Sequence, residues 1–298
     1  SYSIDQKRIM GNDIFISIFS HLWYNHLDSH KTFIMYINPK KIMIDDLPRS
    51  SYSIIKLDDK RSEYRIQKTK SKVFSYGLKK ISDSKGKIIE SGTNGIKIKI
   101  DNVNVNFKII GDFNAYNLLS VYAVAKVLKI EPDIIFKNLS KLDTPNGRMD
   151  FIHGKKNVIG IIDYAHTPDA LENVLINISR FKREAKVITI VGAGGDRDKS
   201  KRPEMGKIAT QFSDYVIFTS DNPRNENEEN ILSDLVKGAV RKNFIIISDR
   251  KKAIQQACLN YKKDSIILVA GKGHEKYQII GEKSIPHDDK EILKKIIL

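Results

Sequence analysis

The amino-acid sequence predicts an α/β protein whose second half forms a doubly wound, mostly parallel sheet of the Rossmann-like kind. From residue 149 onward, short apolar runs alternate with amphipathic stretches, and this alternation is typical of parallel strands joined by helices. Charged loops that contain Gly, Pro or His follow several of the apolar runs. Because the carboxyl ends of parallel strands share one edge of a sheet, we expect these loops to form a single composite site.

Each expected strand of the second half is an apolar run, and each expected helix has apolar residues at helical spacing. The strands are expected at residues 149–154, 157–162, 186–191, 215–220, 244–248, 265–270 and 276–280, and the helices at residues 167–182, 203–213, 228–241, 249–262 and 287–298. The single cysteine, Cys258, lies on the apolar stripe of one of these helices. We therefore expect it in the core rather than in a reactive site.

The first half is expected to be a separate α/β region. Strands are predicted at residues 13–20, 51–59 and 72–78, and helices at residues 32–46, 115–128 and 132–142, with a kink at Pro39 and an N-cap at Asn114. Three runs at residues 87–92, 95–101 and 103–111 alternate in period two, which predicts antiparallel strands. The turn-rich residues 144–148 predict a boundary between domains 1–146 and 147–298.

Residues 91–97, SGTNGIK, are similar to a phosphate-binding loop but lack its essential spacing. That loop needs adjacent Gly and Lys followed by Ser or Thr, whereas Ile96 separates Gly95 from Lys97 and Ile98 follows. We expect a hairpin turn at this position.

Residues 192–203, GAGGDRDKSKRP, connect an expected strand to an expected helix. The glycines leave backbone N–H groups accessible, and a helix N-terminus favours negative charge. Charged residues gather at the same place: Asp196, Arg197, Asp198, Lys199, Lys201 and Arg202. This loop is predicted to suit an anionic ligand.

Three other polar clusters occupy equivalent positions after strands. They are DYAHTPD at residues 163–169, SDNPR at residues 220–224 and GKGHE at residues 271–275. Four independent solvated loops would be the alternative interpretation, but the concentration of ionisable groups at successive strand exits favours one shared site.

The composition is that of a globular protein. Of the 298 residues, 41% are hydrophobic and 29% are charged, with a formal net charge of +15. The lysines are dispersed rather than clustered, so we expect no nucleic-acid partner. The N-terminus has no signal-peptide profile, no apolar run is long enough to span a membrane, and one cysteine fits a reducing compartment, so a cytoplasmic protein is expected. We also expect a monomer.

A group of histidines near residue 26 is a possible divalent-metal site. His21, His26 and His30 lie close to Asp28, although their spacing is not that of a zinc motif. Isolated loop histidines are the alternative.

The motifs as a set resemble the Mur ligases, most specifically the members that add meso-diaminopimelate. The resemblance rests on IDQKRI, NHLDSHKT, GDFNAYNLL, NGR, IDYAHTPDALENVL, GAGGDRDKSKRPEMG, TSDNPR, DR at residues 249–250, AGKGHEKYQ and HDDKE. It covers essentially the whole chain, and it implies part of the family's central α/β ATPase domain followed by its C-terminal domain.

The resemblance implies an ATP-dependent ligase of bacterial peptidoglycan synthesis. In that family a glutamate carboxylate of the UDP-N-acetylmuramoyl-dipeptide attacks the γ-phosphate of ATP, and the amine of meso-diaminopimelate then displaces phosphate from the acyl phosphate. Alignment of the reactants and neutralisation of phosphate charge are the protein's main contributions to such chemistry.

Roles carry over to matching positions only as implications of the resemblance. The implied diaminopimelate pocket consists of Arg197, Asp221, Asn222, Pro223, Arg224, Gly271 and Glu275. In it Arg224 would hold a carboxylate by a bidentate contact, and Asp221 with Asn222 would hold the ammonium. Lysine, the alternative amino acid in the family, lacks that second carboxylate, so Arg224 favours diaminopimelate.

The remaining implied roles concern nucleotide, muramoyl peptide and Mg²⁺. The implied ATP-binding residues are Asn117, Arg148, Asp163 and His166, and those for the muramoyl peptide are Ser1, Gln6 and Arg8. His26 would bind Mg²⁺, and Lys40 would be the catalytic lysine that the family carbamylates, since a carbamate oxygen can bind Mg²⁺ whereas an ammonium cannot.

Several positions depart from the family pattern, and the upstream P-loop part of the central domain is not in the sequence. Tyr2, Asn25, Ser29, Pro39 and Asp112 replace His, Asp, Tyr, Ala and a basic residue, respectively. We expect this partial chain to be inactive alone. A non-catalytic module that binds diaminopimelate or nucleotide remains the alternative.

Overall fold

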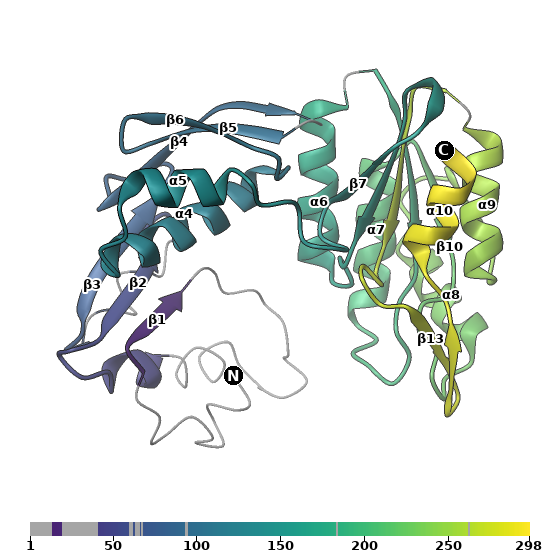
Figure 1. The fold of residues 1–298 in the computed structure, drawn as a ribbon. Helices are drawn as coiled ribbons and strands as arrows, with labels where there is room; N and C mark the ends of the chain where they lie inside the picture. Colours follow the sequence, from purple (N-terminus) through teal and green to yellow (C-terminus); the bar gives the residue numbers. More distant parts are fainter. Residues whose placement is uncertain are drawn as a thin grey trace. The chain divides into compact units, whose positions relative to one another are not determined.

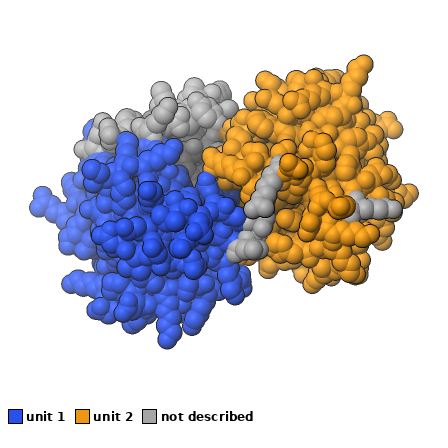
Figure 2. Space-filling model, turned by 90° about the horizontal axis from the view of Figure 1, so that it is seen from above, with its two compact units in different colours: residues 1–143 blue, residues 144–298 orange. Residues whose placement is uncertain are grey.

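The computed structural model describes residues 14–19, 41–59, 62, 66, 68–92, 95–182, 184–261 and 263–298. The chain divides into two compact units, residues 1–143 and 144–298 (Figure 2). Among the helices of the described ranges, none is both long enough and apolar enough to cross a membrane.

The first unit contains a six-stranded sheet in sequence order (Figure 1). Its strands are β1 (Ile16–Phe19), β2 (Tyr52–Lys56), β3 (Lys72–Gly77), β4 (Ser84–Gly92), β5 (Gly95–Ile100) and β6 (Val103–Phe107). The first four pair in parallel, and β4, β5 and β6 pair antiparallel. The predicted antiparallel strands are confirmed, and Gly92 pairs with Gly95 at the predicted hairpin.

Helix α4 (Asp112–Val127) packs against β2, β3, β4 and β5, and α5 (Pro132–Leu139) packs against α4. Their apolar faces share one core with the sheet, in which Leu118, Leu119 and Phe136 are buried. The predicted N-cap is wrong, because the cap residue is Gly111 and Asn114 lies inside the helix. The Asn114 side chain instead donates from Nδ2 to the Ile110 carbonyl at 2.7 Å.

The second unit contains the predicted doubly wound sheet, in the order β11-β10-β9-β12-β8-β7. Its strands are β7 (Asp150–His153), β8 (Val158–Asp163), β9 (Lys186–Val191), β10 (Tyr215–Phe218), β11 (Phe244–Ile246) and β12 (Ser265–Ala270). All neighbours pair in parallel except β7, which is antiparallel to β8 at the edge. A short 3₁₀ helix, η1 (Lys155–Asn157), joins these two strands.

Helices cover the second sheet in two groups. They are α6 (Pro168–Phe181), α7 (Lys201–Phe212), α8 (Glu228–Lys237), α9 (Arg250–Asn260) and α10 (Asp289–Ile297). Helix α7 packs against α6 and α8, whereas α9 packs against α10 (Figure 1). Ile254 and Leu293 of the second group share a core with Ile190, and Cys258 is buried in that core as predicted.

A separate hairpin follows the sheet. Strand β13 (Tyr277–Ile280), which corresponds to the predicted run 276–280, pairs antiparallel with β14 (Lys283–Pro286). Strand β14 was not predicted. All its residues are exposed, so it carries no apolar alternation that a sequence pattern could reveal.

Candidate functional site

The strand order brings the predicted polar loops to one edge of the second sheet. Strand β12 lies between β8 and β9 although it follows both in the sequence. The chain therefore changes direction beside β12, and ligands of open α/β sheets bind at such a point. Ala270, the last residue of β12, pairs with Asp163, the last residue of β8. Residues 271–275 consequently begin beside residues 163–169.

The loop after β9 and the loop after β10 approach each other closely. The Gly195 N–H donates to the Asn222 carbonyl at 2.9 Å, and a Cβ atom at Gly195 would collide with the Pro223 carbonyl oxygen. Arg224 Nη1 donates to the Gly195 carbonyl at 2.8 Å. A residue other than glycine at position 195 would force these loops apart.

Arg224 and Arg197 flank the same short segment. A Cβ atom placed at Gly194 would lie 3.0 Å from Arg224 Nη1 and 3.7 Å from Arg197 Cγ. The Arg224 backbone has a φ of 52° and is held by β13, because its N–H donates to the Ile279 carbonyl and its carbonyl accepts from the Gly281 N–H. This edge of the site therefore carries the Arg224 guanidinium, and the Arg197 side chain begins close to it. Guanidinium groups bind carboxylates.

Two carboxylates, Asp221 and Glu275, face the buried ammonium of Lys272. The Lys272 Nζ atom lies 3.7 Å from Asp221 Oδ1 and 3.6 Å from Glu275 Oε2, and the lysine is fully buried. Burial lowers the pKa of Lys272, and the nearby Asp221 opposes this effect. One ammonium thus faces two carboxylates, which leaves a local excess of negative charge.

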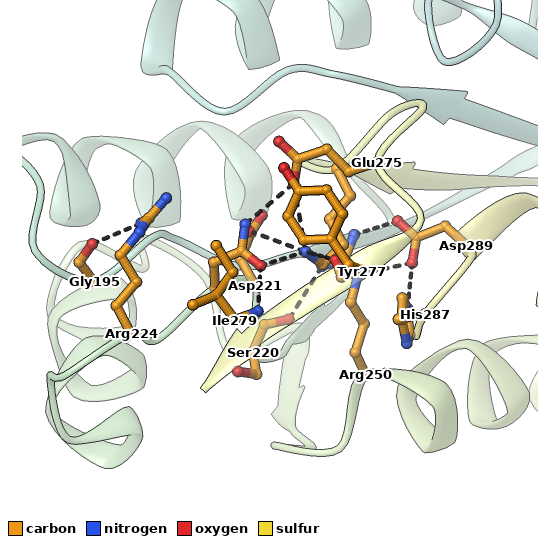
Figure 3. A network of polar contacts seen from close by, with 12 residues as sticks. Gly195, Ser220, Asp221, Arg224, Arg250, Glu275, Tyr277, Ile279, His287 and Asp289 are labelled. Carbon is orange, nitrogen blue, oxygen red and sulfur yellow. Dashed lines mark hydrogen bonds and ion pairs between the residues drawn. The ribbon is translucent and has the colours of Figure 1, made fainter. Parts of the chain in front are cut away.

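The side-chain amide of Asn222 joins this group. Its Oδ1 accepts from Lys272 Nζ at 2.6 Å and from the Ile279 N–H at 3.0 Å. Its Nδ2 donates to Glu275 Oε2 at 3.1 Å. Tyr164 adds a donor from its hydroxyl to Glu275 Oε1 at 3.3 Å. Figure 3 shows the Arg224 guanidinium and the Glu275 carboxylate extending to the same side of this network.

Gly271 gives the Asp221 carboxylate room. Its φ of 116° is one that side chains rarely adopt, and a Cβ atom there would lie 2.5 Å from Asp221 Oδ2. A side chain at position 271 would displace the Asp221 carboxylate, which is a steric reason for a glycine there.

A second buried cation, Arg250, supports the site from α9. Its Nε and Nη2 donate to the two carboxylate oxygens of Asp289, each at 2.8 Å. It also donates to the Ala270 and Ser220 carbonyls, at 2.8 and 3.3 Å, and so ties the ends of β12 and β10 together. Burial alone would raise the pKa of Asp289, but Arg250 outweighs it and holds that pKa far below its usual range.

Arg202 is not available to a ligand, contrary to the predicted cluster of charges around residues 196–202. It is fully buried and donates to Glu226 at 2.9 Å, to Asp234 at 3.2 Å and to the Gly194 carbonyl at 3.3 Å. Lys199 pairs with the same Glu226 at 3.2 Å. The physical reason is that the first turn of α7 packs against α8, which supplies Asp234. Arg202 therefore holds the loop in place through its hydrogen bond to the Gly194 carbonyl.

Three of the implied nucleotide residues lie at the end of β8 in the second unit. Asp163 is buried and accepts from the Met149 N–H at 2.7 Å, and burial raises its pKa to about 6. The Arg148 guanidinium lies 4.6 Å from the centre of the Tyr164 ring. The His166 ring lies 4.6 Å from that same ring, and its partial burial lowers its pKa.

Asn117, the fourth implied nucleotide residue, lies on α4 of the first unit. It is exposed, and its Nδ2 donates to Asn114 Oδ1 at 2.9 Å. Asn117 thus remains a prediction that the second unit's geometry does not address.

The other predicted residues lie outside the described ranges. These are Ser1, Gln6, Arg8, His26 and Lys40, together with His21, Asp28 and His30 of the possible metal site and the predicted kink at Pro39. Among the residues that are described, no group of three or more His, Cys, Asp or Glu side chains could hold a metal ion.

Two residues of the site, Lys272 and Tyr164, lie in loops that were predicted to form it but had no individual predicted role. Arg250 and Asp289 had no predicted role either. Lys272 stands between Gly271 and Glu275 in GKGHE, so its place in that motif was the available signal. Arg250 and Asp289 lie in the quoted motifs DR and HDDKE, but only the fold shows that they contact each other.

The chain resembles known proteins along nearly its whole length. Residues 1–125 match the family described as "Mur ligase middle domain", and residues 147–273 match "Mur ligase, glutamate ligase domain". The protein named UDP-N-acetylmuramoyl-L-alanyl-D-glutamate–2,6-diaminopimelate ligase of Cytophaga hutchinsonii is 44% identical over 300 residues, which cover 100% of this chain and 62% of that relative. The protein of the same name from Bacteroides thetaiotaomicron is 47% identical over 302 residues, with coverages of 99% and 62%.

A solved structure that carries this name agrees with the fold. It superposes with a TM-score of 0.64 at 30% identity and covers 99% of this chain and 62% of its own. The present chain thus spans 62% of the length of these relatives. Since the matches to two domains of one family together occupy most of the chain, the chain belongs to the Mur ligase family.

Proposed function

We propose that this chain is part of an ATP-dependent ligase that adds meso-diaminopimelate to UDP-N-acetylmuramoyl-L-alanyl-D-glutamate in bacterial peptidoglycan synthesis. The observation that carries the proposal is a cluster of charged residues at one edge of the second sheet, with a positive and a negative end. Arg197 and Arg224 form the positive end, and Asp221 and Glu275 form the negative end. The relatives' names supply the amino acid that such a pocket would take.

The charge pattern fits one end of meso-diaminopimelate, which carries an ammonium and a carboxylate on one carbon. The guanidinium groups would bind the carboxylate, and Asp221 with Glu275 would bind the ammonium. The amine at the other end would remain unbound and could attack the acyl phosphate as a neutral amine, with release of phosphate. The contribution of these residues to catalysis would be orientation of that amine.

The end of β8 would contribute to the ATP site. A buried Asp163 beside Arg148 and His166 offers hydrogen-bonding groups for the nucleoside part of ATP. Mg²⁺ would neutralise charge on the phosphates, and we propose His26 and carbamylated Lys40 as its ligands. The proposed muramoyl-peptide residues, Ser1, Gln6 and Arg8, precede them in the chain. The proposed place of action is the cytoplasm.

The proposal is tested by supplying the upstream portion that the relatives have. The chain is fused to, or mixed with, that portion, and ADP release is measured with UDP-N-acetylmuramoyl-dipeptide, ATP and Mg²⁺. We expect ADP release that requires meso-diaminopimelate and is not supported by lysine, and no release by the present chain alone. Absence of diaminopimelate-dependent ADP release from the completed protein would contradict the proposal.

A second candidate function is binding without turnover. It is favoured by Asp112, which stands where the resemblance implies a basic residue and accepts from the Ser91 hydroxyl at 3.1 Å. A carboxylate cannot neutralise a phosphate. For this candidate, calorimetry would show meso-diaminopimelate binding that Arg224→Ala weakens more than tenfold and that Arg241→Ala, an exposed control, leaves unchanged, while the completed protein releases no ADP.

A further inference from the structure

The side-chain amide of Asn222 can adopt only one orientation in this pocket. Its oxygen accepts from Lys272 Nζ and from the Ile279 N–H, and an amide oxygen has two lone pairs. Turning the amide by 180° would place its NH₂ group against two donors. The oxygen is therefore used within the protein, and only Nδ2 can face Glu275 and a bound molecule.

Lys272 occupies an unfavourable place for a lysine. Its ammonium is fully buried, and burying a charge costs free energy unless nearby groups compensate. Two of its three N–H groups are used by neutral oxygens, those of the Asn222 side chain and of the Tyr277 backbone at 2.8 Å. The third faces Asp221 and Glu275 at longer range. This ammonium thereby connects residues 220–224, residues 271–275 and β13.

We infer that Lys272 is a positioning residue that makes Asn222 a hydrogen-bond donor, rather than an acceptor, toward the bound amino acid. The inference rests on the proposed function and changes the expected role of Asn222 in it. Asn222 would donate to a substrate carboxylate, and the ammonium would be left to Asp221 and Glu275. Lys272 itself would not contact the substrate.

The orientation of the amide can be tested without any ligand. Crystal structures of the wild-type chain and of Lys272→Met are compared at the contact between Asn222 Nδ2 and Glu275. We expect the contact in the wild type and its loss in the variant, because one of the two donors that hold the oxygen is gone. The same contact preserved in Lys272→Met would overturn the inference.

Lys186→Met is the matched control. Lys186 pairs with Asp214 at 3.5 Å at the start of β9, which is the opposite end of that strand from the site. This variant also removes one lysine ion pair, and it should leave the Asn222 amide and ligand binding unchanged.

A second variant decides the case if Lys272→Met does not fold. Asn222→Asp keeps an oxygen for Lys272 and Ile279 but replaces the outward NH₂ group with a second oxygen. If Asn222 is a donor, the affinity for meso-diaminopimelate measured by calorimetry falls more than tenfold. If Asn222 accepts from the ammonium, the added charge strengthens binding, and that result would overturn the inference.

A double-mutant cycle separates positioning from a general loss of structure. We expect Lys272→Met to weaken meso-diaminopimelate binding at least tenfold in the wild-type background and less than threefold in an Asn222→Ala background. Equal losses in both backgrounds would contradict action through Asn222. If the wild-type chain and its completed form both fail to bind meso-diaminopimelate, the proposed function fails, and the ligand-free structures alone decide the role of Lys272.

Discussion

Two buried cations of the second unit, Arg250 and Lys272, lie close enough to influence each other electrostatically, and their partners differ. Arg250 contacts both carboxylate oxygens of Asp289, and both side chains are fully buried. Asp289 also contacts His287 Nε2 at 2.8 Å. Lys272 shares its charge between Asp221 and Glu275 at distances above 3.5 Å. The Arg250–Asp289 pair is balanced within the protein, whereas Lys272 faces two carboxylates, so the second cluster has one more negative than positive charge.

The comparison teaches that burial of a charged group does not by itself indicate a functional site. A cation with a saturated set of acceptors holds strands together, as Arg250 does for the ends of β10 and β12. A cation with two competing carboxylates leaves acceptor capacity for another positive group. Substitutions in the first cluster should therefore affect folding, and substitutions in the second should affect binding.

The largest expected effect is on stability, from Asp289→Ala. This variant leaves the Arg250 guanidinium buried without its carboxylate, and breaking such a pair costs about 3–5 kcal/mol. Urea denaturation measures the change. The control Glu90→Ala removes a 74% exposed partner of Lys97 and should cost at most about 1 kcal/mol. Similar losses of unfolding free energy in the two variants would contradict a structural role for the Arg250–Asp289 pair.

The matching substitution in the second cluster is Glu275→Gln, for which we expect the reverse result. The amide keeps the shape of the side chain, so the free energy of unfolding should change by less than about 1 kcal/mol. Loss of the negative charge should weaken meso-diaminopimelate binding more than tenfold by calorimetry. A large loss of stability with unchanged affinity would show that this cluster, too, is structural.

The buried Asp163 carboxyl group predicts that the free energy of unfolding depends on pH. Its folded-state pKa of about 6 lies above the ordinary value of 3.8, so the folded protein binds more protons than the unfolded chain between these values. Asp163 therefore stabilises the folded state below pH 4. This stabilisation, about 3 kcal/mol in all, is lost as the pH rises through 6.

Asp163→Asn should abolish this component. The free energies of unfolding of the wild type and the variant are compared from pH 4 to pH 7, so that other titrating groups cancel. We expect the difference to shift in favour of the variant as the pH rises. A difference that does not change with pH would contradict the raised pKa.

Gly271→Ala tests whether the room beside Asp221 is required. The added Cβ would have both an unfavourable φ and a contact of 2.5 Å with Asp221 Oδ2, so we expect a loss of about 1–3 kcal/mol and weaker amino-acid binding. Gly281→Ala is the matched control, because its φ is also positive but nothing lies within 4 Å of the new atom. Equal effects of the two substitutions on binding would argue against a steric role.

The smallest expected effect is that of Tyr164→Phe. Its hydroxyl donates to Glu275 at 3.3 Å in a partly exposed position, so we expect about 0.5–1.5 kcal/mol in stability. Binding of meso-diaminopimelate should weaken by only a few fold in calorimetry. A larger loss than that of Glu275→Gln would reverse the assigned importance of these two residues.

Much of the second unit was predictable because its signals are local. Continuous apolar runs identified the segments that become β9 and β12, and the polar loops after such runs identified the edge of the site. In the first unit the predicted N-cap at Asn114 was wrong. The Asn114 side chain donates to the Ile110 carbonyl instead, and the fold rather than the local sequence decides which group it reaches. Exposed β14 carried no pattern at all.

The sequence by itself determined the alternating pattern, the polar strand exits and the motifs of a Mur ligase. Only the tertiary structure decided which charged side chains neutralise one another. Asn222 and Lys272 are separated by 50 residues, and Arg250 and Asp289 by 39, so no local pattern links them. They meet because β12 inserts between β8 and β9, a strand order that depends on packing of the whole sheet rather than on the periodicity of any one segment.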